Sequence, residues 1–159
     1  MSVPRQERAG TGVMIDPHAL LPHRFPLLML DRIEVLEPGR LVRGVKTVTG
    51  AEWAVVGAAG TGGVHAMPHL LIVEALAQLS AGIFVELLQG SSGAIGYFMG
   101  IDNVRFRSQA EPGDLLELQI ELRHYRRSIC KTHGAARVDG RLIVEADLTT
   151  VLRAAPVSP

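Results

Sequence analysis

Residues 68–89 form the longest apolar segment of the chain, and their pattern predicts a helix. The segment PHLLIVEALAQLSAGIFVELLQ begins with proline, which suits the first turn of a helix, and the glycines of GSSG follow it. Apolar residues occupy almost every side, so we expect protein to surround this helix on most sides. Glu74 interrupts the pattern, and a carboxylate in apolar surroundings needs a hydrogen-bonding partner. Gln78 lies four residues further on, on the same helix face, and could orient it.

Most of the remaining chain alternates between apolar and polar residues, which predicts strands. LLMLDRIEVLE and RLVRGVKTVT, joined by the turn residues EPGR, are typical of a hairpin. Further strands are predicted by AIGYFMGIDNVRFRS, LLELQIELRHYRR, ICKTHGAARV and RLIVEADLTTVL. The Asp-Gly pair at 139–140 indicates a tight hairpin turn. DPHALLPHR, in which proline follows aspartate, predicts a short helix.

These elements predict an α+β architecture, in which a long antiparallel sheet of about six strands curls around one buried helix. The chain has 159 residues, which is typical of one domain. We place that domain at residues 16–153. A flexible N-terminal arm at 1–15 and a flexible tail at 154–159 are expected at the two ends.

Charge and cysteine content narrow the classes of function. Sixteen basic residues balance sixteen acidic ones, so the net charge gives no reason to expect nucleic-acid binding. The single cysteine, Cys130, cannot form an intrachain disulfide and is interpreted as a small strand filler. No secretory signal is recognisable, and we expect a cytoplasmic protein. Polar residues interrupt the apolar segment 70–88, which argues against a membrane span.

Four blocks of the sequence carry a resemblance to a known family. They are LPHRFPLLMLDRI (21–33), MPHLLIVEALAQ (67–78), YFMGIDNVRFRSQAEPGD (97–114) and VDGRLIVEADL (138–148). In this order they resemble the FabZ-type β-hydroxyacyl-[acyl-carrier-protein] dehydratases. The resemblance implies the hotdog fold, an antiparallel sheet wrapped around one long central helix, and a homodimer or a trimer of dimers. It implies no metal and no cofactor, because the substrate is carried on the phosphopantetheine of acyl carrier protein.

The resemblance also implies a catalytic pair, of which this sequence has one member. Glu74 matches the family's glutamate on the central helix. The family's histidine belongs to a loop that reads approximately HFPGxPVMPG, and its position falls here on Gly60, within GTGGVHAMPH. His65 and His69 are the histidines nearest to this site, and either could replace the missing group. His65 is the better candidate, because it follows a glycine-rich segment.

Other residues are weaker candidates. Gly60 and Gly63 in the loop, Gln78 on the helix, and the strand residues Tyr97, Phe98, Met99 and Gly100 are expected to border the acyl chain of the substrate. Positive charge on three strands could receive the acidic carrier protein, and alternatively belongs to a solvated mixed-charge face. Its proposed partner-binding residues are Arg105, Arg107, Arg126, Arg127 and Lys131. His23 and Arg24, in the block LPHRFP, are interpreted as structural.

Three functions remain open. The first is a hydro-lyase of fatty-acid or polyketide biosynthesis, which eliminates water from a β-hydroxyacyl thioester with Glu74 as the acid. The second is a catalytically degenerate hotdog subunit that binds acyl carrier protein or forms a heteromer with an active dehydratase. The third is an acyl thioesterase, in which Glu74 activates water.

Overall fold

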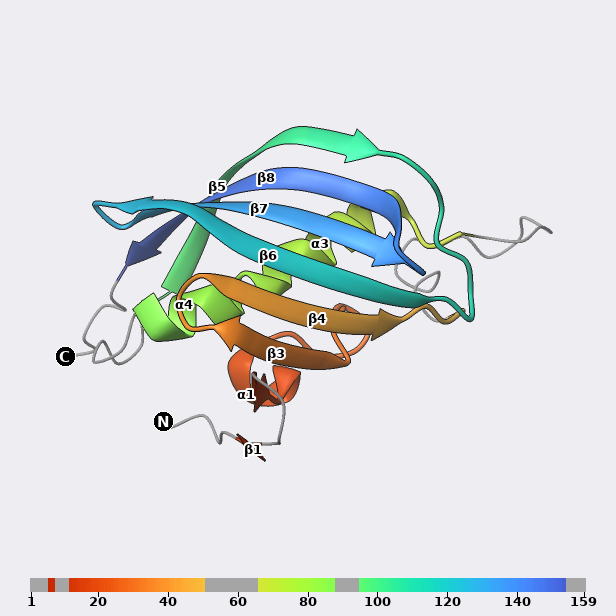
Figure 1. Ribbon diagram of the computed structural model, residues 1–159, viewed down its shortest axis with the longest axis horizontal. Coiled ribbons are helices and arrows are strands. Elements are labelled where there is room, and N and C mark those ends of the chain that lie inside the picture. Colours follow the sequence, from red (N-terminus) through yellow and green to blue (C-terminus); the bar gives the residue numbers. More distant parts are fainter. Residues whose placement is uncertain (1–5, 8–11, 51–65, 88–94, 154–159) are drawn as a thin grey trace.

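One antiparallel sheet curls around a central helix and forms most of the molecule (Figure 1). The computed structural model describes residues 6–7, 12–50, 66–87 and 95–153. The sheet has eight strands in the order β1-β2-β3-β4-β6-β7-β8-β5. Its strands are β1 (Gln6–Glu7), β2 (Val13–Ile15), β3 (Arg32–Glu37), β4 (Leu41–Thr47), β5 (Ile95–Phe106), β6 (Leu115–Arg126), β7 (Ile129–Val138) and β8 (Arg141–Arg153). The predicted α+β class is confirmed, and the curled sheet is that of the hotdog fold.

The hairpins follow the turn residues of the sequence. β3 and β4 pair antiparallel across the segment that contains EPGR, as predicted. β7 and β8 are joined at Asp139 and Gly140, both of which have positive φ, 49° and 78°. A two-residue turn of this kind matches the twist of the flanking strands, and it needs residues such as Asp and Gly that tolerate positive φ. The predicted hairpin at 139–140 is therefore confirmed.

The central helix differs in one respect from the prediction for residues 68–89. It is divided into α3 (His69–Leu79) and α4 (Ala81–Leu87), with Ser80 between them. The Ser80 hydroxyl donates a hydrogen bond to the Ala77 carbonyl, 2.6 Å away. Serine side chains that bond to a nearby backbone carbonyl often bend helices. A pattern of apolar residues does not register such a local bond, so the sequence predicted one helix.

The core lies between the concave face of the sheet and α3. The buried face of α3 consists of Leu71, Ile72, Val73, Ala75, Leu76, Gln78 and Leu79. Gly44 on β4 and Gly134 on β7 face this helix, and a Cβ atom at either position would lie 2.9 Å from the Leu79 or the Ile120 side chain, respectively. Glycine at these positions lets the sheet approach the helix closely. Cys130 is also buried, and burial raises the pKa of its thiol to about 11, in keeping with its interpretation as a strand filler.

Strand structure begins earlier along the chain than predicted. Val13–Ile15, which the sequence analysis assigned to a flexible arm, form β2 and pair with β3, and Ile15 belongs to the buried core. The short helix α1 (Pro17–Leu20) follows, and the Asp16 side chain caps it by accepting a hydrogen bond from the His18 N–H. The alternation in Val13–Ile15 was too short to predict a strand. The proposed tail at 154–159 lies outside the described residues.

Candidate functional site

Glu74 occupies the middle of α3, on a side of the helix that the sheet leaves partly uncovered. Its side chain retains 40% of its exposure, whereas most of its neighbours along the helix are buried. Across from it lies the block 21–30, which connects α1 to β3. The carboxylate is therefore neither sealed in the core nor fully solvated, and it can be reached by a small molecule.

Gln78 holds Glu74 and fixes it to the block 21–30. Its side-chain amide donates one hydrogen bond of 2.7 Å to Glu74 Oε1 and another of 2.8 Å to the Leu27 carbonyl. Its side-chain oxygen accepts a hydrogen bond of 2.9 Å from the Met29 N–H. Because Gln78 is itself buried, with 4% exposure, these bonds satisfy polar groups that water reaches poorly. The predicted orienting contact with Glu74 is present, and the same amide also anchors a distant segment.

His23 lies next to Glu74, with its Nε2 atom 3.8 Å from Glu74 Oε1. Its other ring nitrogen, Nδ1, is buried and has no hydrogen-bond partner among the described residues. Arg24 braces the same segment, since its guanidinium donates to the carbonyls of Leu21 and His23 at 2.8 and 2.7 Å. The sequence analysis interpreted His23 as structural. His23 belongs to the block 21–30, which Gln78 joins to α3 through the Leu27 carbonyl. Gln78 is about fifty residues away from this block, so no local sequence pattern predicts the contact.

His69 is held elsewhere. Its ring stacks on Phe106 with a centroid distance of 4.8 Å, and its Nε2 atom lies 2.8 Å from the Ser108 carbonyl oxygen. A carbonyl only accepts, so Nε2 donates in this contact, and the lone pair of the neutral ring lies on Nδ1. His69 and Glu74 are five residues apart, or about 140° around the helix. The structure therefore directs these two predicted site residues toward different neighbours.

Three other predicted site residues belong to the segment 51–65. His65, Gly60 and Gly63 lie outside the described residues.

The predicted acyl-binding residues of β5 lie along an edge of the sheet. β5 pairs with β8 on one side, and it is the last strand in the sheet order. Tyr97, Phe98 and Met99 are largely exposed, and a Cβ atom at Gly100 would meet no atom within 4 Å. An exposed apolar edge strand invites pairing with another strand. In the single chain these residues therefore border open space.

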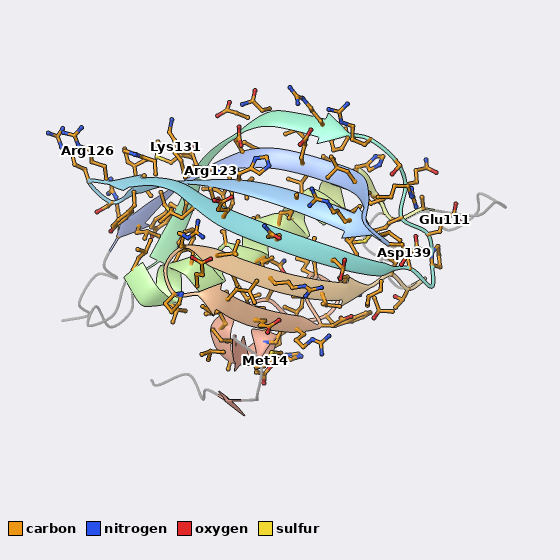
Figure 2. The ribbon with its side chains drawn as sticks, in the orientation of Figure 1. Met14, Glu111, Arg123, Arg126, Lys131 and Asp139 are labelled. Atoms are coloured by element: carbon orange, nitrogen blue, oxygen red, sulfur yellow. The ribbon has the colours of Figure 1, made fainter. Side chains whose placement is uncertain are left out.

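The predicted basic residues form two groups instead of one patch. Arg105 and Arg107 both pair with Glu145 on β8, at 3.4 and 3.2 Å. The hydrogen bond from Arg107, followed by that from Arg105, lowers the pKa of Glu145. The second group, Arg126, Arg127 and Lys131, is exposed around the turn between β6 and β7, where Figure 2 labels Arg126 and Lys131. The five predicted partner-binding residues thus lie in two places along the sheet.

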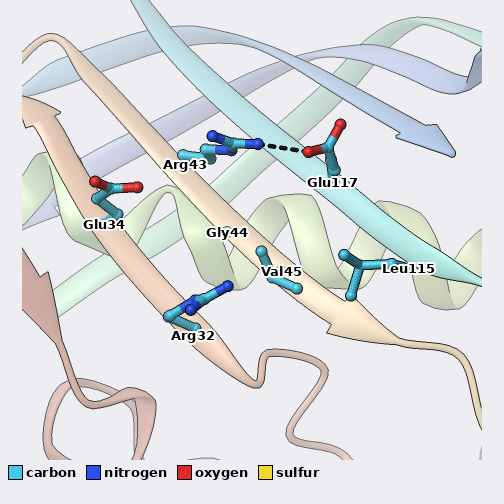
Figure 3. Close-up of a pocket in the computed structure, with 7 residues that line it drawn as sticks. All are labelled: Arg32, Glu34, Arg43, Gly44, Val45, Leu115 and Glu117. Carbon is cyan, nitrogen blue, oxygen red and sulfur yellow. Dashed lines mark hydrogen bonds and ion pairs between the residues drawn. The ribbon is translucent and has the colours of Figure 1, made fainter. Parts of the chain in front are cut away.

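A shallow pocket of about 140 Å³ lies on the outer face of the sheet, away from α3 (Figure 3). It is lined by Arg32, Glu34, Arg43, Gly44, Val45, Leu115 and Glu117. Arg43 donates a hydrogen bond to Glu117 across the pocket, so these two charges of the pocket lining are paired with each other. The sheet separates this pocket from Glu74, and the catalytic candidates take no part in it.

A metal-binding cluster and a helix able to span a membrane are both absent from the described residues. No three or more His, Cys, Asp and Glu side chains come together there in a way that could hold a metal ion. No helix in the described ranges is both long enough and apolar enough to cross a membrane.

Comparison with known proteins places the chain in a family. Residues 21–147 match the family model of the FabA-like domain. The 3-hydroxyacyl-[acyl-carrier-protein] dehydratase FabZ of Syntrophotalea carbinolica is 42% identical over 138 residues, which cover 87% of this chain and 92% of that protein. The FabZ protein of Bacillus subtilis is 41% identical over 133 residues, which cover 84% of this chain and 92% of that protein.

Solved structures support the fold. One chain of the dehydratase heterocomplex ApeI:P from Xenorhabdus doucetiae superimposes with a TM-score of 0.70 at 20% identity, covering 87% of this chain and 91% of that one. A hypothetical thioesterase from Streptococcus pneumoniae with coenzyme A gives a TM-score of 0.60 at 14% identity, covering 81% of this chain and 91% of that one. At such identities the likeness concerns the fold alone. The match over residues 21–147, together with the identity to FabZ proteins, shows that the chain belongs to the FabA-like family.

Proposed function

We propose that this protein is a hydro-lyase that eliminates water from a 3-hydroxyacyl thioester carried on acyl carrier protein. The carrier and the substrate are those named for its FabZ relatives. The observation that carries the proposal is Glu74, which Gln78 holds on the central helix with part of its carboxylate open to a ligand. Since the reaction leaves the oxidation level of the acyl chain unchanged, it needs no redox cofactor.

The elimination requires a base, an acid and a group that stabilises developing charge. The base removes the proton on the carbon next to the thioester carbonyl, the acid protonates the leaving hydroxyl, and a donor supports the enolate oxygen. Glu74 is the proposed acid. α3 begins at His69 without a side-chain cap, so the N–H groups of its first turn are suited to the thioester carbonyl.

The site residues along β5 fit an acyl chain if a second protomer covers them. Tyr97, Phe98 and Met99 give the edge strand an apolar surface that a partner strand would enclose. We propose a homodimer that pairs through β5, with the acyl chain bound in the enclosed space. The exposed cations of the β6–β7 turn are the better candidates for contact with acyl carrier protein, because Arg105 and Arg107 are occupied by Glu145. The proposed location is the cytoplasm.

The experiment incubates the purified chain with a 3-hydroxyacyl carrier-protein thioester. Formation of the enoyl thioester that disappears in Glu74→Gln supports the proposal. Release of free thiol would instead identify a thioesterase.

A second candidate function rests on a specific observation, since the family's histidine position holds Gly60. The chain could serve as the non-catalytic subunit of a heteromeric dehydratase. Tight binding of carrier protein without any turnover, together with co-purification with an active dehydratase, would favour that function over the first.

A further inference from the structure

The elimination needs two proton-transfer groups, and the family's usual second group is absent at Gly60. Among the described residues, His23 is a histidine within ion-pair distance of Glu74, with 3.8 Å between Nε2 and Oε1. His69, the other described candidate, bonds the Ser108 carbonyl and stacks on Phe106, about 140° around α3 from Glu74. The geometry therefore points to a residue that the sequence analysis had set aside.

We propose that His23 is the catalytic base of this site and works with Glu74 as its acid, an inference that rests on the proposed dehydratase function. The two groups must reach adjacent carbons of one substrate, since the proton leaves the carbon next to the carbonyl and the hydroxyl leaves the following carbon. Groups separated by 3.8 Å meet this requirement. The distance is also too long for a direct hydrogen bond, so His23 Nε2 and Glu74 Oε1 both stay available to a substrate.

One ring nitrogen of His23 has no hydrogen-bond partner among the described residues, which supports a role beyond packing. A buried ring nitrogen without a partner is uncommon, because each unsatisfied polar group costs free energy. His23 Nδ1 is such an atom among the described residues. If Nδ1 carries the ring proton, Nε2 presents its lone pair on the side of Glu74. The ring itself is 36% exposed, which leaves a path for substrate.

The backbone around His23 is fixed, as a catalytic base requires. Arg24 donates to the carbonyls of Leu21, His23 and His18. Gln78 joins the Leu27 carbonyl and the Met29 N–H to the same helix that carries Glu74. The Gln78 amide therefore positions the proposed acid, Glu74, by a direct hydrogen bond. It positions the proposed base, His23, by holding the block 21–30 to which His23 belongs. Among the residues that the structure describes, Glu74 on α3 and Arg24 in the block 21–30 are charged groups beside His23.

The reaction balances within this pair. His23 Nε2 takes the proton from the carbon next to the carbonyl, and the C–H electron pair becomes the new carbon–carbon double bond. The bond from the next carbon to the hydroxyl oxygen breaks with its electrons on oxygen, and the Glu74 carboxyl proton converts that hydroxyl to water. The resulting imidazolium and carboxylate return to the starting state when one proton passes from His23 to Glu74.

The test measures turnover and its pH dependence in the full-length protein. His23→Gln keeps polar atoms at the position but cannot take a proton, and we expect kcat to fall by about 10²–10⁴-fold with KM little changed. The acidic limb of the pH–rate profile, where a protonated His23 cannot accept the substrate proton, should disappear from the residual activity. Added imidazole should restore part of the kcat of His23→Ala. His18→Gln is the matched control, because His18 is an exposed histidine close by in sequence, and its kcat should stay unchanged.

The possible contrary results separate the two levels of the proposal. Turnover that survives His23→Gln and is lost in His65→Gln assigns the base to the loop and overturns this inference, while the dehydratase function stands. A fall in kcat with an unmoved acidic limb, and with no rescue by imidazole, shows that His23 only supports the segment and also overturns it. If wild-type protein binds the carrier-protein thioester but forms no enoyl product, the proposed function itself fails. Should His23→Ala not fold, the pH profile of His23→Gln decides.

Discussion

Two carboxylates in this chain each lie beside a histidine, and they differ in how completely they are bonded. Asp147, on the outer face of β8, accepts hydrogen bonds from Asn103 at 2.7 Å and from His133 Nδ1 at 2.8 Å. Glu74, on the central helix, accepts one hydrogen bond from Gln78, and its histidine stands off at 3.8 Å. We call Asp147 with His133 the closed pair, because a hydrogen bond joins its members, and Glu74 with His23 the open pair, because none does.

The bonding decides what each pair can do. The Asn103 hydrogen bond, followed by the His133 hydrogen bond, lowers the pKa of Asp147, so this carboxylate is held in its charged form and is a poor proton donor. A group that is to exchange protons with a substrate needs a face that no protein group occupies. The Glu74–His23 pair has that face, and the Asp147–His133 pair does not. Proximity of a histidine to a carboxylate is therefore insufficient to identify a catalytic pair.

The largest effect should come from replacing the carboxyl group of Glu74, which is the proposed proton donor of the open pair. Glu74→Gln should lower kcat for the carrier-protein thioester by about 10²–10⁴-fold, since glutamine can still accept the Gln78 hydrogen bond but cannot act as an acid. Asp147→Asn is the matched control in the closed pair and should retain wild-type kcat. Equal losses in both variants would remove the distinction between the pairs. Activity is followed by the absorbance of the enoyl thioester.

A smaller effect, on stability, should follow from removing the residue that holds the open pair in place. Gln78→Leu leaves the Met29 N–H and the Leu27 carbonyl without their partner, and buried unsatisfied groups cost roughly 1–3 kcal/mol each. We expect the free energy of unfolding in urea to fall by about 2–6 kcal/mol, the sum for these two groups. Gln119→Leu, at an exposed position of β6, should change it by less than about 0.5 kcal/mol. A Gln78→Leu protein as stable as wild type would mean that the block 21–30 is held by other contacts.

The smallest effect concerns the closed pair and its dependence on pH. The folded state lowers the pKa of Asp147 below the ordinary value of 3.8, so the charged form contributes stability above that value. This contribution is lost as the pH falls through the folded-state pKa. Asp147→Asn should therefore unfold more easily than wild type at neutral pH, by at most about 1 kcal/mol because the pair is partly exposed.

The control for this prediction is the same comparison at low pH and at high salt. The difference between Asp147→Asn and wild type should shrink below pH 3.8, where the wild-type carboxylate becomes protonated too. It should also shrink in about 1 M salt, which screens exposed charges. A difference that grows toward low pH would contradict the assignment of the lowered pKa.

The strands, the turns and half of the candidate site could be predicted from local sequence. Alternation places Leu116, Leu118, Ile120 and Leu122 on one face of β6, and the structure buries the first three and leaves Leu122 partly buried. The Asp-Gly pair encodes its own turn through the φ angles that it tolerates. The Gln78–Glu74 contact follows from helical spacing, because residues four apart share a face. Each of these features depends on neighbours within a few residues.

The rest was decided by tertiary structure. His23 was interpreted as structural because nothing in LPHRFP indicates which helix it will meet, and the meeting depends on Gln78 bonding to Leu27 across the fold. For His69, another predicted candidate, tertiary packing decides that its ring contacts Phe106 and Ser108. The sequence by itself determined the family and the hotdog architecture, since these depend on periodicity and on matching blocks, and it placed the proposed acid, Glu74, on the central helix. Which histidine faces that acid depends on how distant segments pack, and local patterns carry no record of contacts between residues far apart in the chain.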